Sequence, residues 1–212
     1  MRTLLLDLDG TLTDPFDGIS RSLGHAMAGL GLAPLTSEQQ RACIGPPLPD
    51  SFLRLGVPAA QVDEAIALYR EYYSDRGLFE NRVYDGVPEA LAALRSSGLR
   101  LAVATSKPEP FAVQVMEHFG LDAFVDHISG STLDGSVGTK AAVISLALGV
   151  LDGSDPQDVT MVGDRAHDVH GAAAHGIRCL GVRWGYADPG ELEAAGAYAV
   201  AERPADLAAL LG

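Results

Sequence analysis

Short apolar runs that end in turn residues recur along most of the chain. The first, Thr3–Leu8, leads into the polar turn sequence DGTLTD. Runs of this length bounded by turn residues are typical of buried parallel strands. On this basis we predict strands at Thr3–Leu8, Leu99–Thr105, Ala123–Ser129, Asp158–Val162, Arg178–Val182 and Ala197–Val200.

Amphipathic segments lie between these runs. Apolar residues recur at helical spacing, and a glycine follows several of the segments, as at Gly98 and Gly120, which indicates helix ends. The helices predicted in this way are Val87–Ser97, Pro108–Phe119, Thr139–Leu148, Ala166–His175 and Pro204–Leu211. Strands that alternate with helices predict an α/β fold with a doubly wound parallel sheet, a Rossmann-like core.

Residues 15–82 break this alternation, because they show helical periodicity without a clear strand. The predicted helices are Phe16–Leu30, Ser37–Cys43, Pro49–Leu55 and Ala59–Gly77. One crossover helix is enough to join two parallel strands, so this segment is surplus to the sheet. We therefore predict two domains: an α/β core of residues 1–14 and 83–212, and a small all-helical cap of residues 15–82 inserted after the first strand.

Composition and charge restrict the partners. The chain has 212 residues, of which 47% are hydrophobic, and a net charge of −13. Nucleic acid and anionic membrane surfaces both require a basic face, so we expect neither partner. Cys43 and Cys179 lie far apart without metal-ligand spacing, which favours free thiols in a reducing cytoplasm. The N-terminal segment does not fit a signal peptide or a spanning helix, and we expect a soluble, cytoplasmic protein.

The candidate chemistry lies where predicted strands end. Asp7 and Asp9 close the first strand, and residues two apart in a strand point to the same side with Cα atoms about 6–7 Å apart. Two such carboxylates can hold a phosphoryl group between them, one attacking in line and the other handling the proton of the leaving oxygen. The alternative is a solvated pair at a turn, although an unpaired carboxylate inside an apolar run is costly.

A second acidic pair, Asp164 and Asp168, follows the strand that ends at Val162. The two residues are one helical turn apart and can face one site. Together with the first pair they form a set of hard oxygen ligands suited to Mg²⁺. The alternative is an N-cap aspartate with an exposed neighbour.

Lys140 is the candidate cation. Among the 15 basic residues only Lys107 and Lys140 are lysines, and both lie beside strand-end segments. A compact ammonium neutralises a phosphate or a carboxylate. Thr105 and Ser106 would add a hydroxyl and a backbone N–H for phosphate oxygens, or else serve as ordinary turn residues.

Other candidates give weaker signals. His167, His170 and His175 do not form a zinc-ligand pattern, and we interpret Trp184 and Tyr186 as loop packing. The glycine clusters match neither the P-loop nor the dinucleotide-binding fingerprint.

Taken together, these segments resemble the haloacid dehalogenase (HAD) superfamily, subfamily I. The resemblance rests on DLDGT at 7–11, VATSK at 103–107, Lys140, and VGDRAHD at 162–168. The helical insert resembles that family's C1 cap, and its IGPPL sequence at 44–48 is similar to the phosphoglycolate phosphatase-like branch. Two departures are visible: Ala141 stands where many relatives have a proline, and Asp9, absent from true dehalogenases, disfavours carbon–halogen cleavage.

The resemblance implies a Mg²⁺-dependent phosphatase that hydrolyses a small phosphate monoester through an aspartyl-phosphate intermediate. It implies Asp7 as nucleophile, Asp9 as general acid/base, Thr105 as phosphate ligand and Lys140 as the neutralising cation. Mg²⁺ would be held by Asp7, the backbone carbonyl of Asp9, Asp164 and Asp168. We further expect Ser106, Arg41 and Gly45 to bind substrate, the last two from the cap loop that begins at Arg41. We expect a small phosphorylated metabolite as partner and a monomer or homodimer.

Four alternatives remain open. A phosphomutase or other phosphotransferase would use the same aspartates, and product analysis separates it from a hydrolase. A 5′-nucleotidase is one specific form that the phosphatase activity can take. A phosphorylated signalling module would not need a cap, and a non-catalytic binding protein would be expected to lack one of the motif residues.

Overall fold

The computed structural model describes residues 2–151 and 155–211. It contains a six-stranded sheet in which every pairing is parallel: β1 (Thr3–Leu6), β4 (Arg100–Pro108), β5 (His127–Ser131), β6 (Val159–Gly163), β7 (Arg178–Val182) and β8 (Ala199–Ala201). The strand order is β5-β4-β1-β6-β7-β8. The predicted doubly wound parallel sheet is therefore confirmed. The order reverses at β1, and ligands of such sheets bind beyond the carboxyl ends of the strands at this reversal.

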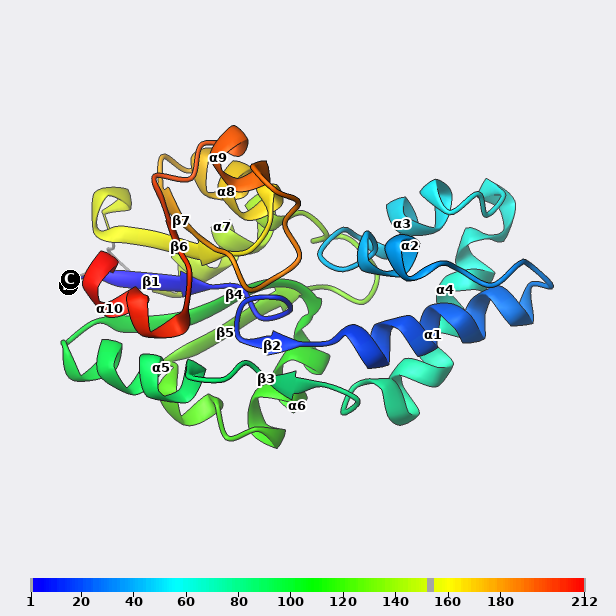
Figure 1. The fold of residues 1–212 in the computed structure, drawn as a ribbon, viewed down its shortest axis with the longest axis horizontal. Coiled ribbons are helices and arrows are strands. Elements are labelled where there is room, and N and C mark those ends of the chain that lie inside the picture. Colours follow the sequence, from blue (N-terminus) through cyan, green and yellow to red (C-terminus); the bar gives the residue numbers. More distant parts are fainter. Residues whose placement is uncertain (1, 152–154, 212) are drawn as a thin grey trace. The chain divides into compact units, whose positions relative to one another are not determined.

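Helices cover both faces of this sheet (Figure 1). The helices α7 (Lys140–Val150), α8 (Ala166–Ala173) and α9 (Glu191–Ala195) lie on one face, and α5 (Val87–Ser96), α6 (Glu109–His118) and α10 (Leu207–Leu211) on the other. Short 3₁₀ turns lie at Asp122–Phe124, Pro156–Asp158 and Pro204–Asp206. One core cluster packs Leu5 and Ala102 of the sheet against Ile144 of α7 and Ala172 of α8. Apolar packing on both faces fixes the strand ends relative to one another.

Some elements of the sheet and its covering helices differ from the sequence prediction. The strand predicted from Ala123 begins at His127, because Asp122–Phe124 forms a 3₁₀ turn and the Asp126 carboxylate accepts the backbone N–H of Leu101 at 3.2 Å. The helix α7 passes through Gly149 and ends at Val150. The short helix α9 was not predicted, since its five residues are too few to show periodicity.

The chain separates into two compact units. The sheet unit comprises the described residues up to Asp14 and from Val83 onward, and the helical unit spans Pro15–Arg82. The second unit contains α1 (Phe16–Gly29), α2 (Ser37–Arg41), α3 (Leu48–Arg54), the 3₁₀ turn Ala59–Gln61, α4 (Val62–Tyr72) and the π-helical turn η2 (Tyr73–Gly77). Its core includes Leu23, Phe52 and Tyr69, and the rings of Phe52 and Tyr69 meet edge to face at 6.4 Å. The single helix predicted over 59–77 is divided into three helical segments.

Two short strands lie where the chain passes between the units. β2 (Thr13–Asp14) and β3 (Arg82–Val83) form a two-stranded sheet, and the backbone N–H of Tyr84 donates to the carbonyl of Leu12 at 3.1 Å. Two-residue strands are too short to leave an alternating pattern, so the sequence did not predict them.

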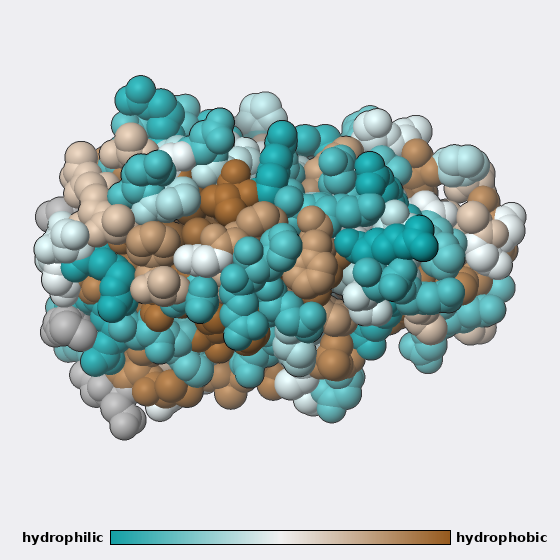
Figure 2. All heavy atoms as spheres, turned by 90° about the horizontal axis from the view of Figure 1, so that it is seen from below, coloured by the Kyte–Doolittle hydropathy of each residue, from teal (hydrophilic) through white to brown (hydrophobic). Residues whose placement is uncertain are grey.

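Polar and apolar residues are interspersed over the face displayed in Figure 2. Within the described ranges, the structure has no helix that is both long enough and apolar enough to cross a membrane.

Candidate active site

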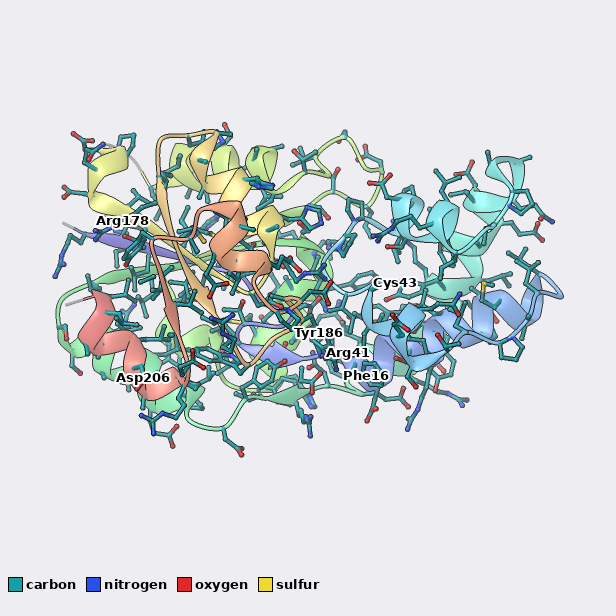
Figure 3. All side chains as sticks on the ribbon, turned by 45° about the horizontal axis from the view of Figure 1, so that its top comes forward. Phe16, Arg41, Cys43, Arg178, Tyr186 and Asp206 are labelled. Atoms are coloured by element: carbon teal, nitrogen blue, oxygen red, sulfur yellow. The ribbon has the colours of Figure 1, made fainter. Side chains whose placement is uncertain are left out.

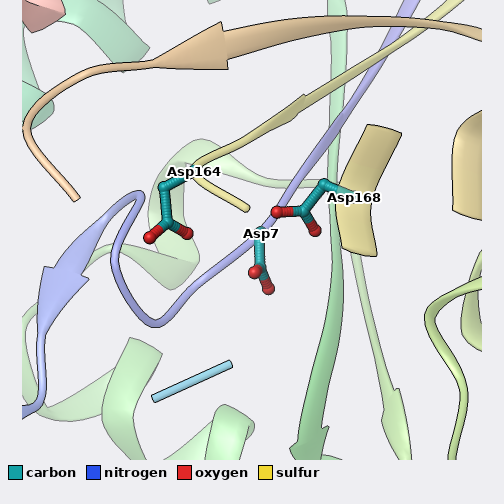
Figure 4. A group of neighbouring side chains, drawn as sticks. All are labelled: Asp7, Asp164 and Asp168. Atoms are coloured by element: carbon teal, nitrogen blue, oxygen red, sulfur yellow. The ribbon is translucent and has the colours of Figure 1, made fainter. Parts of the chain in front are cut away.

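Three buried carboxylates meet at the carboxyl ends of β1 and β6. Asp7 directly follows β1, Asp164 follows β6, and Asp168 lies in the first turn of α8. One oxygen from each carboxylate lies within 4.8 Å of the others (Figure 4). The exposed fractions are 5% for Asp7, 0% for Asp164 and 1% for Asp168. The fold thus gathers acidic side chains that are up to 161 positions apart (7 to 168) in the sequence.

Lys140 supplies a positive charge to this group. It is the first residue of α7, and its Nζ lies 2.7 Å from Asp7 Oδ1 and 2.8 Å from Asp168 Oδ1. The ammonium also donates to the carbonyl of Ala104 at 3.1 Å. Burial lowers the pKa of Lys140, but the adjacent Asp168 and Asp7 carboxylates outweigh it and raise the pKa overall. Lys140 is therefore a permanent cation in the site.

One ammonium does not balance three carboxylates. Burial, together with the negative charges of Asp168 and Asp7, raises the pKa of Asp164 well above its ordinary value. Burial and the nearby Asp7 carboxylate raise the pKa of Asp168 to about 6, although Lys140 opposes this shift. A buried cluster of hard oxygen donors with excess negative charge is chemically suited to a divalent cation.

Backbone and glycine contacts hold Asp164 in place. Its Oδ1 accepts from Thr11 Oγ1 at 3.3 Å, and its Oδ2 accepts from the backbone N–H of Tyr186 at 2.8 Å. A Cβ on Gly10 would lie 2.2 Å from Asp164 Oδ2, and a Cβ on Gly185 would lie 2.4 Å from the same atom. Gly10 also has a φ of +89°, which favours glycine. These close approaches explain the glycine of the DLDGT motif.

Asp9 lies outside the group of three carboxylates and has its own partner. Lys107 Nζ donates to both of its oxygens, at 2.8 and 2.7 Å. Burial raises the pKa of Asp9, although the Lys107 charge opposes this shift. The two lysines of the chain thus have different partners: Lys140 contacts Asp7, and Lys107 contacts Asp9.

Thr105 and Ser106 lie on the last part of β4, where the pairing with β5 shifts register between Thr105 and Pro108. Thr105 is buried, and its Oγ1 accepts the backbone N–H of Lys107 at 3.2 Å. The carbonyl of Ser106 accepts from Ser131 Oγ at 2.8 Å. Both residues are therefore held on the strand that also carries Lys107.

The remaining predicted residues, Arg41 and Gly45, belong to the helical unit. Arg41 is the exposed last residue of α2, and the backbone N–H of Ile44 donates to its carbonyl at 3.1 Å. Gly45 has a φ of +102°, a conformation that favours glycine. Arg41 and Cys43 are labelled in this unit in Figure 3, and Cys43 is a free thiol, as is Cys179.

Trp184 and Tyr186, which the sequence analysis interpreted as loop packing, both contact residues of the candidate site. Trp184 Nε1 donates to the carbonyl of Thr11 at 3.0 Å, and Tyr186 supplies the backbone N–H to Asp164. A backbone donor leaves no signal in the sequence, whereas Lys107 was marked by the rarity of lysine. Among the histidines, His175 Nε2 lies 2.8 Å from the carbonyl of Ala141, and the metal-ligand group found in the described residues contains none of them.

Comparisons with known proteins show which family the chain belongs to. The family model described as haloacid dehalogenase-like hydrolase matches residues 4–182. The chain is 44% identical over 183 residues to "Tyrosine-protein kinase PtkA" of Mycobacterium tuberculosis. This match covers 86% of the present chain but 62% of that relative, so the chain spans less than two thirds of the relative's length. It is 43% identical over 208 residues to "5'-nucleotidase" of Pseudomonas aeruginosa, covering 98% of this chain and 92% of the relative.

Two further comparisons extend across almost the whole chain. A "Phosphoglycolate phosphatase, plasmid" of Cupriavidus necator is 33% identical, covering 98% of this chain and 92% of the relative. A crystal structure described as a "predicted phosphatase from Clostridium acetobutylicum" superposes with a TM-score of 0.94 at 36% identity, covering 100% of this chain and 98% of that one. The resemblance stated from the motifs is confirmed: the chain belongs to the haloacid dehalogenase-like hydrolase family.

Proposed function

We propose that this protein is a Mg²⁺-dependent phosphatase that hydrolyses a small phosphate monoester through an aspartyl-phosphate intermediate. The observation that carries the proposal is the packing of Asp7, Asp164 and Asp168 within 4.8 Å, with Lys140 bridging Asp7 and Asp168. A catalytic carboxylate needs a neighbouring positive charge before an anionic phosphate can approach it. This site combines a buried carboxylate, a fixed ammonium and a set of oxygen donors for a metal.

In the proposed reaction, a carboxylate oxygen of Asp7 attacks phosphorus and the bond to the leaving alcohol breaks. Asp9 gives its proton to the departing oxygen and later takes a proton from the water that hydrolyses the acyl phosphate. The raised pKa of Asp9 supports this role. A carboxyl with a raised pKa is protonated in a larger fraction of molecules near neutral pH and so has a proton to give. Lys140, Thr105 and Ser106 would bind the phosphate oxygens.

The oxygen donors support Mg²⁺ as the cofactor. Asp7, Asp164, Asp168 and the backbone carbonyl of Asp9 would hold it. When bound, Mg²⁺ supplies positive charge that offsets the excess negative charge of the carboxylates and of the substrate phosphate. Asp164 is the best-supported ligand, because it is fully buried and two hydrogen bonds and two glycines fix its position.

We propose that the unit of residues 1–14 and 83–212 is the catalytic core and that residues 15–82 form a cap carrying substrate contacts. Arg41 and Gly45 are the candidates for these contacts. The guanidinium of Arg41 offers planar N–H donors for an anionic group. Gly45 has a positive φ and no side chain, so its backbone N–H and carbonyl are accessible to a ligand. Two buried free thiols support a reducing cytoplasm as the location.

The substrate class is a phosphoglycolate-, nucleotide- or sugar-phosphate-like monoester. The relatives named "5'-nucleotidase" and "Phosphoglycolate phosphatase, plasmid" support the first two. A second candidate function is phosphoryl transfer to an acceptor other than water, because a relative with 44% identity is named "Tyrosine-protein kinase PtkA".

The test is a phosphate-release screen over phosphoglycolate, nucleoside monophosphates and sugar phosphates, with Mg²⁺ and with EDTA. We expect Mg²⁺-dependent release of inorganic phosphate, with one class preferred by catalytic efficiency. Transfer of labelled phosphate to a tyrosine peptide or a sugar without release would support the second candidate. Equal rates with Mg²⁺ and EDTA would contradict the proposal.

A further inference from the structure

The segment Trp184–Tyr186, which follows β7, contacts the loop of the DLDGT sequence at residues 7–11, called the motif loop below. Trp184 Nε1 donates to the carbonyl of Thr11, and the backbone N–H of Tyr186 donates to Asp164 Oδ2 at 2.8 Å. Thr11 in turn donates through Oγ1 to Asp164 Oδ1. The Asp164 carboxylate is therefore held from one side by the motif loop and from the other by the segment that contains Tyr186.

Gly185 brings the two segments into close contact. A Cβ on Gly185 would lie 2.4 Å from Asp164 Cβ and 2.4 Å from the carbonyl oxygen of Gly10. Such distances leave no room for a side chain, so Gly185 is required for the approach. The backbone at Gly185 therefore lies directly against the loop that contains Gly10.

The side chain of Tyr186 reaches a different part of the chain. Its hydroxyl donates a hydrogen bond to Asp14 Oδ1, and the residue is 8% exposed. Asp14 is the last residue of β2, one of the two short strands through which the chain passes to and from the helical unit. Tyr186, labelled in Figure 3, thus bonds Asp164 through its backbone and the outgoing linker through its hydroxyl.

We propose that Tyr186 is a positioning residue that couples the Asp164 carboxylate to the linker strand β2. The proposal rests on the proposed function only in taking Asp164 as a metal ligand. A bound cation would restrict the Asp164 carboxylate further than its hydrogen bonds do and, through the Tyr186 backbone N–H, would restrict the position of the phenol ring. The hydroxyl then holds Asp14, so occupation of the metal site stabilises the linker that leads to residues 15–82.

The first test measures amide hydrogen exchange of residues 12–16 and 81–84 in the metal-free protein. The Tyr186→Phe variant keeps the backbone bond to Asp164 and loses only the hydroxyl contact. We expect its linker amides to exchange about three- to tenfold faster than in the wild type, as the loss of one hydrogen bond implies. Tyr198→Phe is the matched control, because Tyr198 lies in the same unit and is 40% exposed, and its linker exchange should equal that of the wild type.

The second test adds Mg²⁺. Calorimetry should show that Tyr186→Phe binds Mg²⁺ more weakly than the wild type, by the same factor as the Mg²⁺-dependent slowing that it loses, because coupling between two sites is reciprocal. Linker exchange should slow on Mg²⁺ addition in the wild type and in Tyr198→Phe, and stay unchanged in Tyr186→Phe. A merely structural tyrosine would leave both the metal-dependent response and the Mg²⁺ affinity as they are in the wild type.

Equal linker exchange in the wild type and in Tyr186→Phe would overturn the link between Tyr186 and the linker. Equal Mg²⁺-induced slowing in both would overturn the coupling. Failure of Mg²⁺ to bind the wild type would instead contradict the proposed function and, with it, the metal-linked part of this inference.

Asp14→Ala provides an independent check, because it removes the other partner of the same bond. In a double-mutant cycle, Tyr186→Phe should add little to the exchange rate of Asp14→Ala. Fully additive effects of the two changes would also overturn the proposal.

Discussion

The two units of this protein differ in how deeply their charged side chains are buried. In the described part of the sheet unit, five charged side chains are buried: Asp7, Lys107, Lys140, Asp164 and Asp168. In the described part of the helical unit, the buried polar side chains are the serines Ser20, Ser22 and Ser51. Its ion pairs lie nearer the surface, as between Arg21 and Glu80, whose side chains are 57% and 24% exposed.

This difference separates the source of stability from the source of chemistry. Removing charges from water costs several kcal/mol per ion unless they are paired, so buried charges rarely improve stability. The helical unit is stabilised by apolar packing around Phe52 and Tyr69. The sheet unit has an apolar core as well, and in addition a cluster of buried charges, which is the kind of feature that marks candidate functional sites.

The largest expected effect comes from replacing the proposed nucleophile. Asp7→Asn should lower the turnover of an aryl phosphate with Mg²⁺ by at least about a thousandfold, because an amide oxygen does not form the acyl phosphate. Steady-state phosphate release measures this effect. Urea denaturation with EDTA should give an unfolding free energy no lower than that of the wild type, since one of three clustered carboxylates is neutralised. Unchanged turnover would remove Asp7 as nucleophile.

Replacing each of the two buried lysines tests where the excess negative charge of the sheet unit lies. Lys140→Met leaves Asp7 and Asp168 without their shared cation, and should lower the free energy of unfolding at pH 8 in EDTA by about 3–5 kcal/mol. Lys107→Met is the matched control, and we expect a smaller loss because the Asp9 side chain is 15% exposed and can be hydrated. Urea denaturation of both variants provides the measurement. A larger loss for Lys107→Met would contradict the placement of the main charge imbalance at Asp7, Asp164 and Asp168.

The pH dependence of stability follows from the raised pKa values. Asp168 has a folded-state pKa of about 6 against an ordinary value of 3.8, so between these values the folded state holds a proton that the unfolded state has lost. The unfolding free energy of the metal-free protein should therefore fall as pH rises from 4 to above 6. The fall attributable to Asp168 is on the order of 3 kcal/mol.

Denaturation in EDTA from pH 4 to pH 8 measures this slope, and Asp168→Asn should reduce it. Saturating Mg²⁺ should reduce it as well, because a bound cation favours the ionised carboxylates. A stability that rises steadily through this range in the absence of metal would contradict the charge imbalance.

The smallest effect is expected in the helical unit. If Arg41 contacts the substrate, Arg41→Ala should raise the KM by about tenfold, the size expected for one charged hydrogen bond, with kcat and stability unchanged. Arg21→Ala is the matched control, since it removes an arginine of the same unit that pairs with Glu80, and its KM should equal that of the wild type. Equal KM values for both variants and the wild type would remove Arg41 from the proposed substrate contacts.

Much of the fold was predictable because it depends on local patterns. Strand runs and helical periodicity need only neighbouring residues, and the predicted α/β sheet with helices alternating from residue 83 is confirmed. The errors lie where a pattern is too short, as at α9 and β2, or where a distant contact sets an element's start, as the bond between Asp126 and Leu101 does for β5.

The acidic residues and lysines of the site were identifiable because their side-chain types and positions at strand ends are visible in the sequence. Their partners were not. The Lys107–Asp9 ion pair joins residues 98 positions apart, and the bonds of Tyr186 to Asp164 and Asp14 span 22 and 172 positions.

The amino-acid sequence by itself therefore determined the strand and helix types and the family, since these depend on residue chemistry and short spacing. Only the tertiary structure decided which lysine faces which aspartate and which backbone N–H holds Asp164. These choices depend on the order of strands in the sheet, which brings distant segments to the same edge, and on close approaches at Gly10 and Gly185 that no local pattern encodes.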